Sequence, residues 1–260
     1  MISQMQQKSE SPDTKGKILE VRGLTKRFGG IIANDDIDMD VLVGEIVGLI
    51  GPNGAGKSTL FDMVAGVKPS GSKRFPDAGC VRFLGHDITH FKAHQVCRLG
   101  LARTFQIVRI LEKMSVLENV TVGALCRTSE VYEAEKKAEK ICEFVGLKDR
   151  QNLAGGELTI EGKKRLELAR ALATEPKLLL LDEVMAGLNP SEVAGTLDLL
   201  RQINKQGITI IIVEHVMEAV MAISDRIVVL DYGKKIADDT PEAVVKDKNV
   251  IDAYLGSEDA

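Results

Sequence analysis

The stretch GPNGAGKST, residues 51–59, has the residue types and spacing of a loop that holds phosphate groups. It fits the pattern G-x-x-x-x-G-K-[ST], in which glycines let the backbone turn its N–H groups inward around an anion. The apolar stretch EIVGLI precedes it and STLFDMVAGV follows with helical spacing, so a helix N-terminus adds positive dipole. We therefore expect a nucleotide to contact Gly51, Pro52, Asn53, Gly54, Ala55, Gly56, Lys57, Ser58 and Thr59. Lys57 would reach the β- and γ-phosphates, and the Ser58 hydroxyl would bind Mg²⁺.

A second candidate site is LLLLDE, residues 178–183, where a buried apolar strand ends in two carboxylates. Asp182 is expected to hold Mg²⁺, directly or through water. Glu183 is placed to orient and polarise an attacking water. A strand ending in Asp-Glu is common, but its pairing with the phosphate loop in one chain favours phosphoryl chemistry.

The elements that position these residues alternate along the chain. Strand patterns occur at 18–28 and 37–51, and helical patterns at 131–147 and 163–174. Three short apolar runs, KLLLL, ITIIIV and RIVVL, precede Asp182, Glu214 and Asp231, and a helical stretch separates the first two. Strands that alternate with helices predict an α/β fold with a mostly parallel sheet and crossover helices.

Composition limits the class of protein. The chain has 260 residues and a net charge of −4, which gives no support to nucleic-acid binding. The four cysteines form no C-x-x-C pair and are expected to be reduced thiols. The polar N-terminus is predicted to be a disordered tail over 1–17 and not a secretory signal. No apolar run approaches the ~18 residues that span a bilayer, so any membrane role requires a partner.

Five features stand in a fixed order: GPNGAGKST, Gln106 in ARTFQ, LTIEGKKRLELARAL, LLLLDE, and His215 in IIIVEH. In this order the chain resembles an ATP-binding cassette (ABC) ATPase from about residue 18 onward. The resemblance implies a single domain, 18–260, with a mostly parallel core sheet, an antiparallel β subdomain and a helical subdomain at about 91–162. It also implies ATP and Mg²⁺ as ligands.

The resemblance assigns further roles. Phe28, in LTKRFGG, matches the aromatic residue that stacks on adenine, and an ordinary core phenylalanine is the alternative. Gln106 matches the glutamine that contacts metal or water and senses a membrane partner, and His215 matches the histidine that contacts the γ-phosphate. The expected catalytic residues are Lys57, Gln106, Glu183 and His215, and the expected metal ligands are Ser58, Gln106 and Asp182.

The signature of the family, Leu-Ser-Gly-Gly-Gln, has two candidate positions. LAGGE at 153–157 looks closer in composition. However, the family spacing of eleven residues to the Ala of ARAL, and of 24 residues to the metal-binding Asp, both place the first Leu at 158. We therefore predict that LTIEG, residues 158–162, is the signature, with Leu158, Thr159 and Glu161 at the nucleotide of a partner subunit.

This signature departs from the family pattern. Thr159 keeps the hydroxyl and can cap the following helix, but Ile160 and Glu161 replace the two glycines that allow close backbone approach. Glu161 would also bring negative charge near the γ-phosphate. We therefore predict that this chain supports its partner's ATP site poorly, while its own phosphate loop would be competent beside a full signature. In the loop AGLN, residues 186–189, Asn189 replaces the usual Asp, and Val184 replaces the usual Pro.

The stretches RTFQ, MSVLENV and AYLG are similar to one of the two ATPases of branched-chain amino acid importers. That resemblance implies a second ABC ATPase subunit, two transmembrane permease subunits and, indirectly, a periplasmic solute-binding protein. It also implies a peripheral location at the cytoplasmic face of the inner membrane, with the segment 107–125 near the groove for a permease helix.

Other interpretations stay open. A urea or amide importer of the same subfamily would share these motifs, and an ATP-gated dimerising switch would hydrolyse little. A non-transport cassette ATPase is disfavoured because the chain has neither a long coiled-coil insertion nor a second cassette. The histidines at 86, 90 and 94 could bind a metal on a continuous helix, but a predicted strand and turn lie directly before them.

Overall fold

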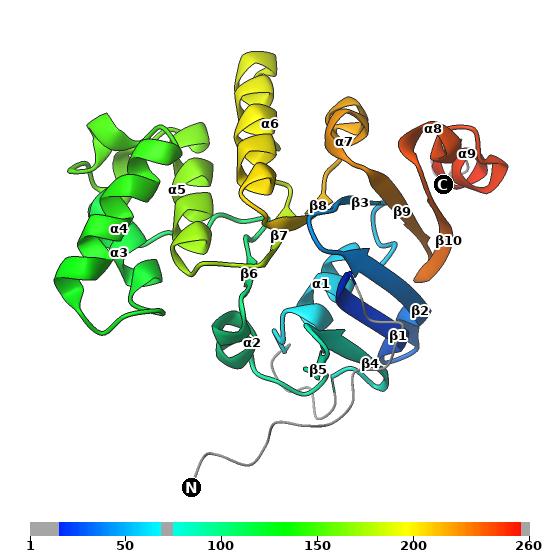
Figure 1. Ribbon diagram of the computed structural model, residues 1–260. Coiled ribbons are helices and arrows are strands. Elements are labelled where there is room, and N and C mark those ends of the chain that lie inside the picture. The colour runs from blue at the N-terminus through cyan, green and yellow to red at the C-terminus, as the bar shows by residue number, and fades with distance from the viewer. Residues whose placement is uncertain (1–15, 69–74, 256–260) are drawn as a thin grey trace, which may run out of the picture.

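Two β-sheets form the framework of the computed structural model, which describes residues 16–68 and 75–255 (Figure 1). The larger sheet has six strands in the order β10-β9-β3-β8-β7-β6. β10 is antiparallel to β9, and the other neighbouring pairs are parallel, which confirms the mostly parallel sheet expected from the sequence. Its strands are β3 (Ile46–Ile50), β6 (Leu101–Arg103), β7 (Leu178–Asp182), β8 (Thr209–Val213), β9 (Arg226–Asp231) and β10 (Lys234–Asp239).

The central strands are buried on both faces. Every residue of β3, β7 and β8 is buried, which is why these strands are continuous apolar runs without alternation. On β7, Leu179 and Leu181 face one hydrophobic cluster, and Leu178 and Leu180 face the other. The first cluster includes helices α6 (Pro190–Lys205) and α7 (Met217–Ile223); the second includes α1 (Lys57–Val64) and the smaller sheet (Figure 1).

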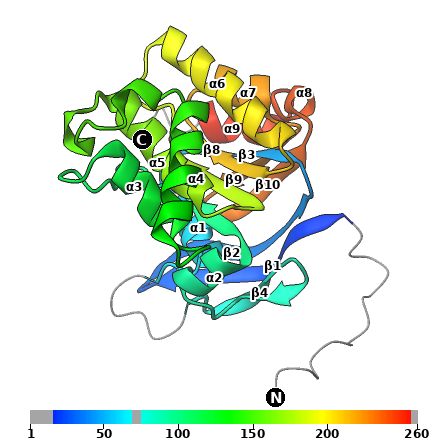
Figure 2. The same cartoon turned by 60° about the vertical axis from the view of Figure 1, so that its left-hand side comes forward.

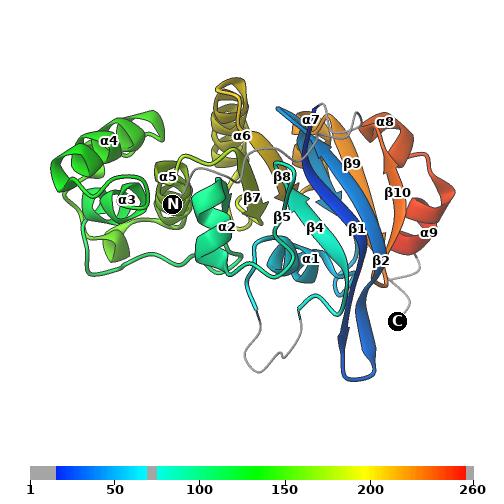
Figure 3. The ribbon, with the colours of Figure 1, turned by 60° about the horizontal axis from the view of Figure 1, so that its bottom comes forward.

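The smaller sheet is antiparallel and runs beside α1 (Figure 3). Its order is β2-β1-β4-β5, with β1 (Lys17–Phe28), β2 (Ile31–Leu42), β4 (Ala78–Phe83) and β5 (His86–Asp87). The strand pattern predicted over 37–51 is divided between two sheets, because the chain turns at Gly44, where φ is +80°, and enters β3. Lys17, predicted to end the tail, is the first residue of β1, and residues 1–15 lie outside the described part.

A group of helices lies beyond the β6 edge of the larger sheet (Figure 1), and Figure 2 shows the same helices turned toward the viewer. It contains α3 (Val116–Ala124), α4 (Val131–Phe144) and α5 (Ile160–Ala173), and α2 (Ala93–Leu99) leads toward it. Short 3₁₀ turns occur at η2 (Lys148–Arg150) and η3 (Gly155–Glu157). In α4, which lies within the helical pattern predicted over 131–147, Ala134 and Ala138 are buried, but Val131 is 56% exposed because it begins the helix.

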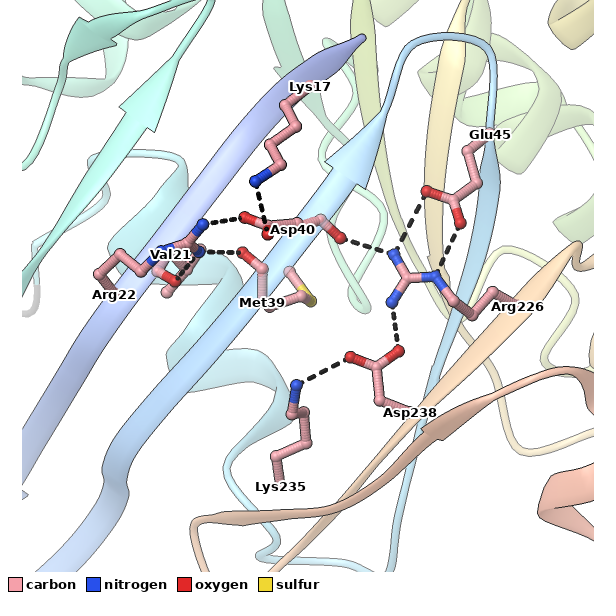
Figure 4. Close-up of polar contacts among 9 residues, drawn as sticks. All are labelled: Lys17, Val21, Arg22, Met39, Asp40, Glu45, Arg226, Lys235 and Asp238. Atoms are coloured by element: carbon pink, nitrogen blue, oxygen red, sulfur yellow. Dashed lines mark hydrogen bonds and ion pairs between the residues drawn. The ribbon is translucent and has the colours of Figure 1, made fainter. Parts of the chain in front are cut away.

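The two sheets are joined by a network around Arg226, the first residue of β9 (Figure 4). Its guanidinium donates to Glu45 at 2.8 Å, to the Asp40 carbonyl at 2.6 Å, and to Asp238. Burial alone would lower the Arg226 pKa, but Glu45 and Asp238 raise it above its ordinary value. The Arg226 side chain therefore links β2 of the small sheet to β9 and β10 of the large sheet. Lys17 and Lys235 add ion pairs to Asp40 and Asp238 (Figure 4).

The last two helices of the described residues, α8 (Pro241–Val244) and α9 (Lys248–Leu255), pack beside β9 and β10. Among residues 16–68 and 75–255, no helix combines the length and apolar character needed to cross a bilayer. In the same part of the chain, no His, Cys, Asp and Glu side chains gather in groups of three that could bind a metal. His86 lies on β5 and His94 on α2, while the Sγ atoms of Cys97 and Cys126 approach to 3.9 Å.

Candidate functional site

The phosphate loop connects β3 to α1, and packing requires glycine at two of its positions, Gly51 and Gly56. At Gly51, where φ is +148°, a Cβ atom would lie 2.0 Å from the Leu230 carbonyl oxygen. At Gly56, where φ is +102°, it would lie 2.1 Å from the Ala33 carbonyl oxygen. Gly54 also has positive φ, +82°, but faces open space. The loop thus turns sharply against β9 and β2, and its middle faces outward.

Lys57, the first residue of α1, lies across this loop. Its Nζ donates to the carbonyl oxygens of Gly51 at 2.7 Å and Pro52 at 2.9 Å. Burial lowers the pKa of the amine, while the nearby carboxylates of Glu183 and Asp182 oppose that shift. The ammonium group therefore lies within the electrostatic reach of both carboxylates that the sequence singled out. Ser58, the next residue, is exposed.

Asp182 ends β7 and is buried, with 2% of its side chain exposed. Arg103 Nη2 donates to its Oδ2 at 3.0 Å, and Arg103 Nη1 pairs with Asp62 on α1. Burial raises the pKa of Asp182, and Arg103 opposes this effect. Arg103 therefore links the strand that ends in the acidic pair to the helix that begins at the phosphate loop. Sequence analysis missed this residue, although it lies three positions before Gln106.

The second carboxylate oxygen of Asp182 is a candidate ligand for the expected Mg²⁺. Among the described residues, Oδ1 is buried and has no hydrogen-bond partner. A buried oxygen of this kind is costly unless a cation or water occupies its lone pairs. A carboxylate, a hydroxyl and an amide oxygen are the hard oxygen donors that suit Mg²⁺. The residues Asp182, Ser58 and Gln106 therefore fit this cation.

Glu183 is held at two points. Gln106 Nε2 donates to Oε2 at 3.1 Å, and His215 Nε2 lies 3.0 Å from Oε1. The backbone of Glu183 has positive φ, +52°, which is uncommon for a residue with a side chain. Gln106 and His215, which are far from Glu183 in the sequence, thus both contact its carboxylate.

Helix α5 fixes the segments that carry this trio. Glu167 is buried and accepts from the backbone N–H groups of Phe105 at 3.3 Å and Arg109 at 3.2 Å, on both sides of Gln106. Burial raises the pKa of Glu167. Lys164 Nζ donates to the Glu183 carbonyl oxygen at 2.6 Å. Sequence analysis missed both residues, which it treated only as part of the helix predicted over 163–174.

Glu214, the residue before His215, is another buried carboxyl that sequence analysis missed. It is 2% exposed, and its Oε1 accepts from the Met185 N–H at 2.6 Å. It therefore joins the loop after Glu183 to the segment that carries His215. Burial raises its pKa to about 7, partly opposed by the Met185 N–H and by Lys164, while Glu183 adds to the increase.

This raised pKa predicts a pH-dependent stability. In the unfolded chain the carboxyl loses its proton near 4.5, whereas the folded protein keeps it to about 7. The contribution of Glu214 to the free energy of unfolding is therefore largest below pH 4.5 and falls as pH rises through 7. We expect Glu214→Gln to gain up to ~3 kcal/mol relative to the unsubstituted chain between pH 5 and pH 8. Urea unfolding at both pH values measures this gain, and an equal difference at both would contradict the assignment.

The structure separates the two candidate signatures. In LAGGE, the N–H groups of Gly155 and Gly156 are already bonded to the carbonyls of Met114 at 2.9 Å and Glu112 at 3.0 Å. In LTIEG, Thr159 is the N-cap of α5, and its hydroxyl accepts from the Gly162 N–H at 3.2 Å. The N–H groups at the start of a helix have no acceptor within the helix and can bind an anion. This favours LTIEG.

The negative charge of Glu161 has an ion-pair partner in the same helix, which sequence analysis did not predict. Its carboxylate accepts from Arg165 Nε at 2.6 Å, one turn along α5, and both side chains are mostly buried. Ile160 is 61% exposed at the helix start, and Leu158, two residues earlier, is buried in the hydrophobic core. The missing glycines therefore remain the main departure from the family pattern, because the negative charge has an internal partner.

The other residues that sequence analysis singled out differ in their exposure and in their contacts. Phe28 ends β1 and is 41% exposed, with Lys26 Nζ 5.2 Å from its ring centre, so it is not a core side chain. Asn189 is the N-cap of α6 and accepts from the Glu192 N–H at 3.0 Å, a role that Asn and Asp fill equally well. Val184 is buried in the core cluster beside α6.

Comparisons with known proteins agree with this site. The family model described as ABC transporter matches residues 34–186, and the model described as Branched-chain amino acid ATP-binding cassette transporter matches 234–260. The high-affinity branched-chain amino acid transport ATP-binding protein BraF of Pseudomonas aeruginosa is 37% identical over 92% of this chain and 98% of its own. The protein of the same description in Escherichia coli K12, LivG, gives the same three values. A probable LivG of Archaeoglobus fulgidus is 36% identical over 94% of this chain and 97% of its own.

Solved structures of ATP-binding cassettes are also similar to the chain. A nucleotide-free ATP-binding cassette from an ABC transporter superposes with a TM-score of 0.82 at 30% identity, covering 92% of this chain and 98% of that one. An ATP-binding cassette of an ABC transporter in its ADP conformation also gives 0.82, at 31% identity, covering 92% and 99%. The order of the motifs, the two sheets and these similarities lead to one conclusion: the chain is an ATP-binding cassette ATPase and belongs to the ABC transporter family.

Proposed function

We propose that this chain hydrolyses ATP to drive an importer of branched-chain amino acids, as one of its two ATPase subunits. The observation that carries the ATPase chemistry is the Glu183 carboxylate, held by Gln106 and His215 one residue after the buried Asp182. The solute is proposed because the similar chains BraF and LivG are named for branched-chain amino acid transport. A family model of that transporter group also matches the C-terminal part of the chain.

The residues of the chain divide the chemistry among them. The phosphate loop would surround the phosphates with backbone N–H groups, and Lys57 would exchange its two carbonyl partners for the β- and γ-phosphates. Glu183 would orient the attacking water, and His215 would contact the γ-phosphate. Phe28, exposed at the end of β1, would stack on adenine. Asp182, Ser58 and Gln106 would hold Mg²⁺, which when bound neutralises phosphate charge.

The transmembrane partners would dock at a groove between α2, α3 and α5. The groove has a volume of ≈440 Å³ and is lined by residues that include Phe105, Arg109, Val122 and Cys126. Ile107 nearby is 80% exposed. A groove next to Gln106 suits control of Glu183 by a permease helix. This would place the chain at the cytoplasmic face of the membrane, with a solute-binding protein acting indirectly through the permeases.

The signature predicts an asymmetric pair of ATP sites. Without the two glycines, LTIEG offers its helix start to a partner's γ-phosphate less closely than the family pattern does. The chain's own loop, Asp182, Glu183 and His215 match the family pattern, so a companion ATPase with a full signature would complete a competent site. A homodimer would have two weakened sites.

The test is ATP hydrolysis by this chain alone and mixed with its companion ATPase. We expect at least roughly 10-fold higher turnover in the mixture than with this chain alone. That increase should disappear when this chain carries Glu183→Gln and the companion is unsubstituted. Equal turnover with and without the companion would contradict the asymmetry. ATP-dependent dimers without turnover in either sample would instead favour the switch that hydrolyses little. Uptake of labelled leucine or urea into proteoliposomes of the whole transporter distinguishes the solutes.

A further inference from the structure

We propose that the C-terminal helix α9 braces the phosphate loop, and that Tyr254 is a positioning residue for ATP binding. This inference rests on the proposed function only in that the loop binds ATP. It assigns a role to the C-terminal segment, which lies about 200 residues from the loop in sequence.

The contact is made at the first residue of the loop. The Gly51 N–H donates to the Tyr254 hydroxyl, and burial raises the pKa of that hydroxyl while this N–H opposes the shift. The Gly51 carbonyl accepts from Lys57 Nζ at 2.7 Å. One residue thus binds the C-terminal helix through its N–H and the phosphate-binding lysine through its C=O. Because these two groups flank the Gly51 Cα, fixing one restrains the rotation of the other.

The body of the Tyr254 ring packs on a hydrophobic cluster that supports the same point. The cluster contains Ile50, which precedes Gly51, together with Val229 on β9 and Val250 on α9. Gly51 itself is buried and has no room for a side chain against Leu230. The entry to the loop is therefore enclosed by β9 on one side and α9 on the other, and Tyr254 supplies a hydrogen bond there.

The middle of the loop is open by contrast. Asn53 and Gly54 face a cavity of ≈760 Å³ whose opposite wall is made by Tyr232 and by Asn249 and Asp252 of α9. The brace therefore acts at Gly51 and leaves the outward part of the loop accessible. This is the arrangement expected of a residue that sets the loop's conformation without touching the phosphates.

Tyr254→Phe tests the inference, because it removes the hydroxyl and keeps the ring in the cluster. Removing it leaves the buried Gly51 N–H without its acceptor. We expect affinity for a fluorescent ATP analogue to fall roughly 3- to 10-fold, KM for ATP to rise by a similar factor, and kcat to change less than about 2-fold. Tyr132→Phe, at an exposed tyrosine of α4 that does not line this cavity, is the matched control and should change none of these.

Urea unfolding of Tyr254→Phe and Tyr254→Ala separates positioning from packing. If Tyr254→Phe lowers stability but leaves affinity and KM unchanged, the residue is structural only and the inference is wrong. If Tyr254→Phe changes kcat more than KM, it is also wrong, because the residue would then act on chemistry. If the unsubstituted chain binds no ATP analogue, the proposed function fails together with the inference. If the unsubstituted chain and Tyr254→Phe bind the analogue equally well, the inference alone is wrong.

Discussion

Glu183→Gln is expected to reduce steady-state ATP hydrolysis by roughly 100- to 1000-fold and to leave ATP binding intact. The amide has the shape of the carboxylate and can still meet Gln106 at 3.1 Å and His215 at 3.0 Å. It cannot accept a proton from water or polarise it as an anion does. Phosphate release, measured with the companion ATPase present, and equilibrium binding of a fluorescent ATP analogue separate the two effects.

The matched control for this substitution is Glu218→Gln. Glu218 is an exposed carboxylate at the start of α7, three residues after His215, and its substitution removes the same charge at the surface. The turnover of this variant should stay within about 2-fold of the unsubstituted chain. If Glu183→Gln lowers turnover less than about 10-fold, the carboxylate does not act on the attacking water, and the proposed mechanism is wrong.

Arg103→Met is expected to lower the free energy of unfolding by about 3–5 kcal/mol. Arg103 is 7% exposed and Asp182 is 2% exposed, so the substitution leaves a buried carboxylate without its cation. Asp62 loses the same partner. Urea unfolding measures the loss. A buried pair broken on one side costs far more than the pair contributes, because the remaining charge cannot be solvated.

A double-mutant cycle with Asp182→Asn tests that cause. In the chain that carries Asp182→Asn the uncompensated charge is absent, so Arg103→Met should cost at least ~1.5 kcal/mol less than it does beside the native Asp182. Arg98→Met, which removes an exposed arginine from α2, controls for the loss of an arginine and should change stability by less than ~0.5 kcal/mol. Equal costs of Arg103→Met in both backgrounds would show that packing, and not the ion pair, is responsible.

The parts of the site that sequence analysis predicted are those encoded by local spacing. The phosphate loop follows a buried strand and begins a helix within 14 residues, from Ile46 to Thr59, so its context is visible in the sequence. The apolar runs before Asp182 and Glu214 likewise predicted central parallel strands, since strands buried on both faces have no polar positions. The position of the signature followed from spacing, and the cap of α5 at Thr159 agrees with it.

The parts that it missed depend on contacts between distant segments. Arg103 meets Asp62 and Asp182, which are 41 and 79 residues away, and no local pattern marks such a triad. Glu167 supports the Gln106 segment from a helix 58 to 62 residues away. One signal was available and unused: Glu161 and Arg165 are four residues apart on a helix, a spacing at which opposite charges pair. That spacing indicates that the Glu161 charge is compensated.

The two contacts that hold Glu183 come from different segments, one beside the groove and one after β8. Two such contacts determine which way the carboxylate points. A shift of the Gln106 segment would therefore change the rate of hydrolysis. The carboxylate would be aligned for the reaction only during the fraction of time in which both contacts hold. Transport and hydrolysis would then be coupled by alignment: a subunit detached from its permeases could still bind ATP, yet would consume it slowly.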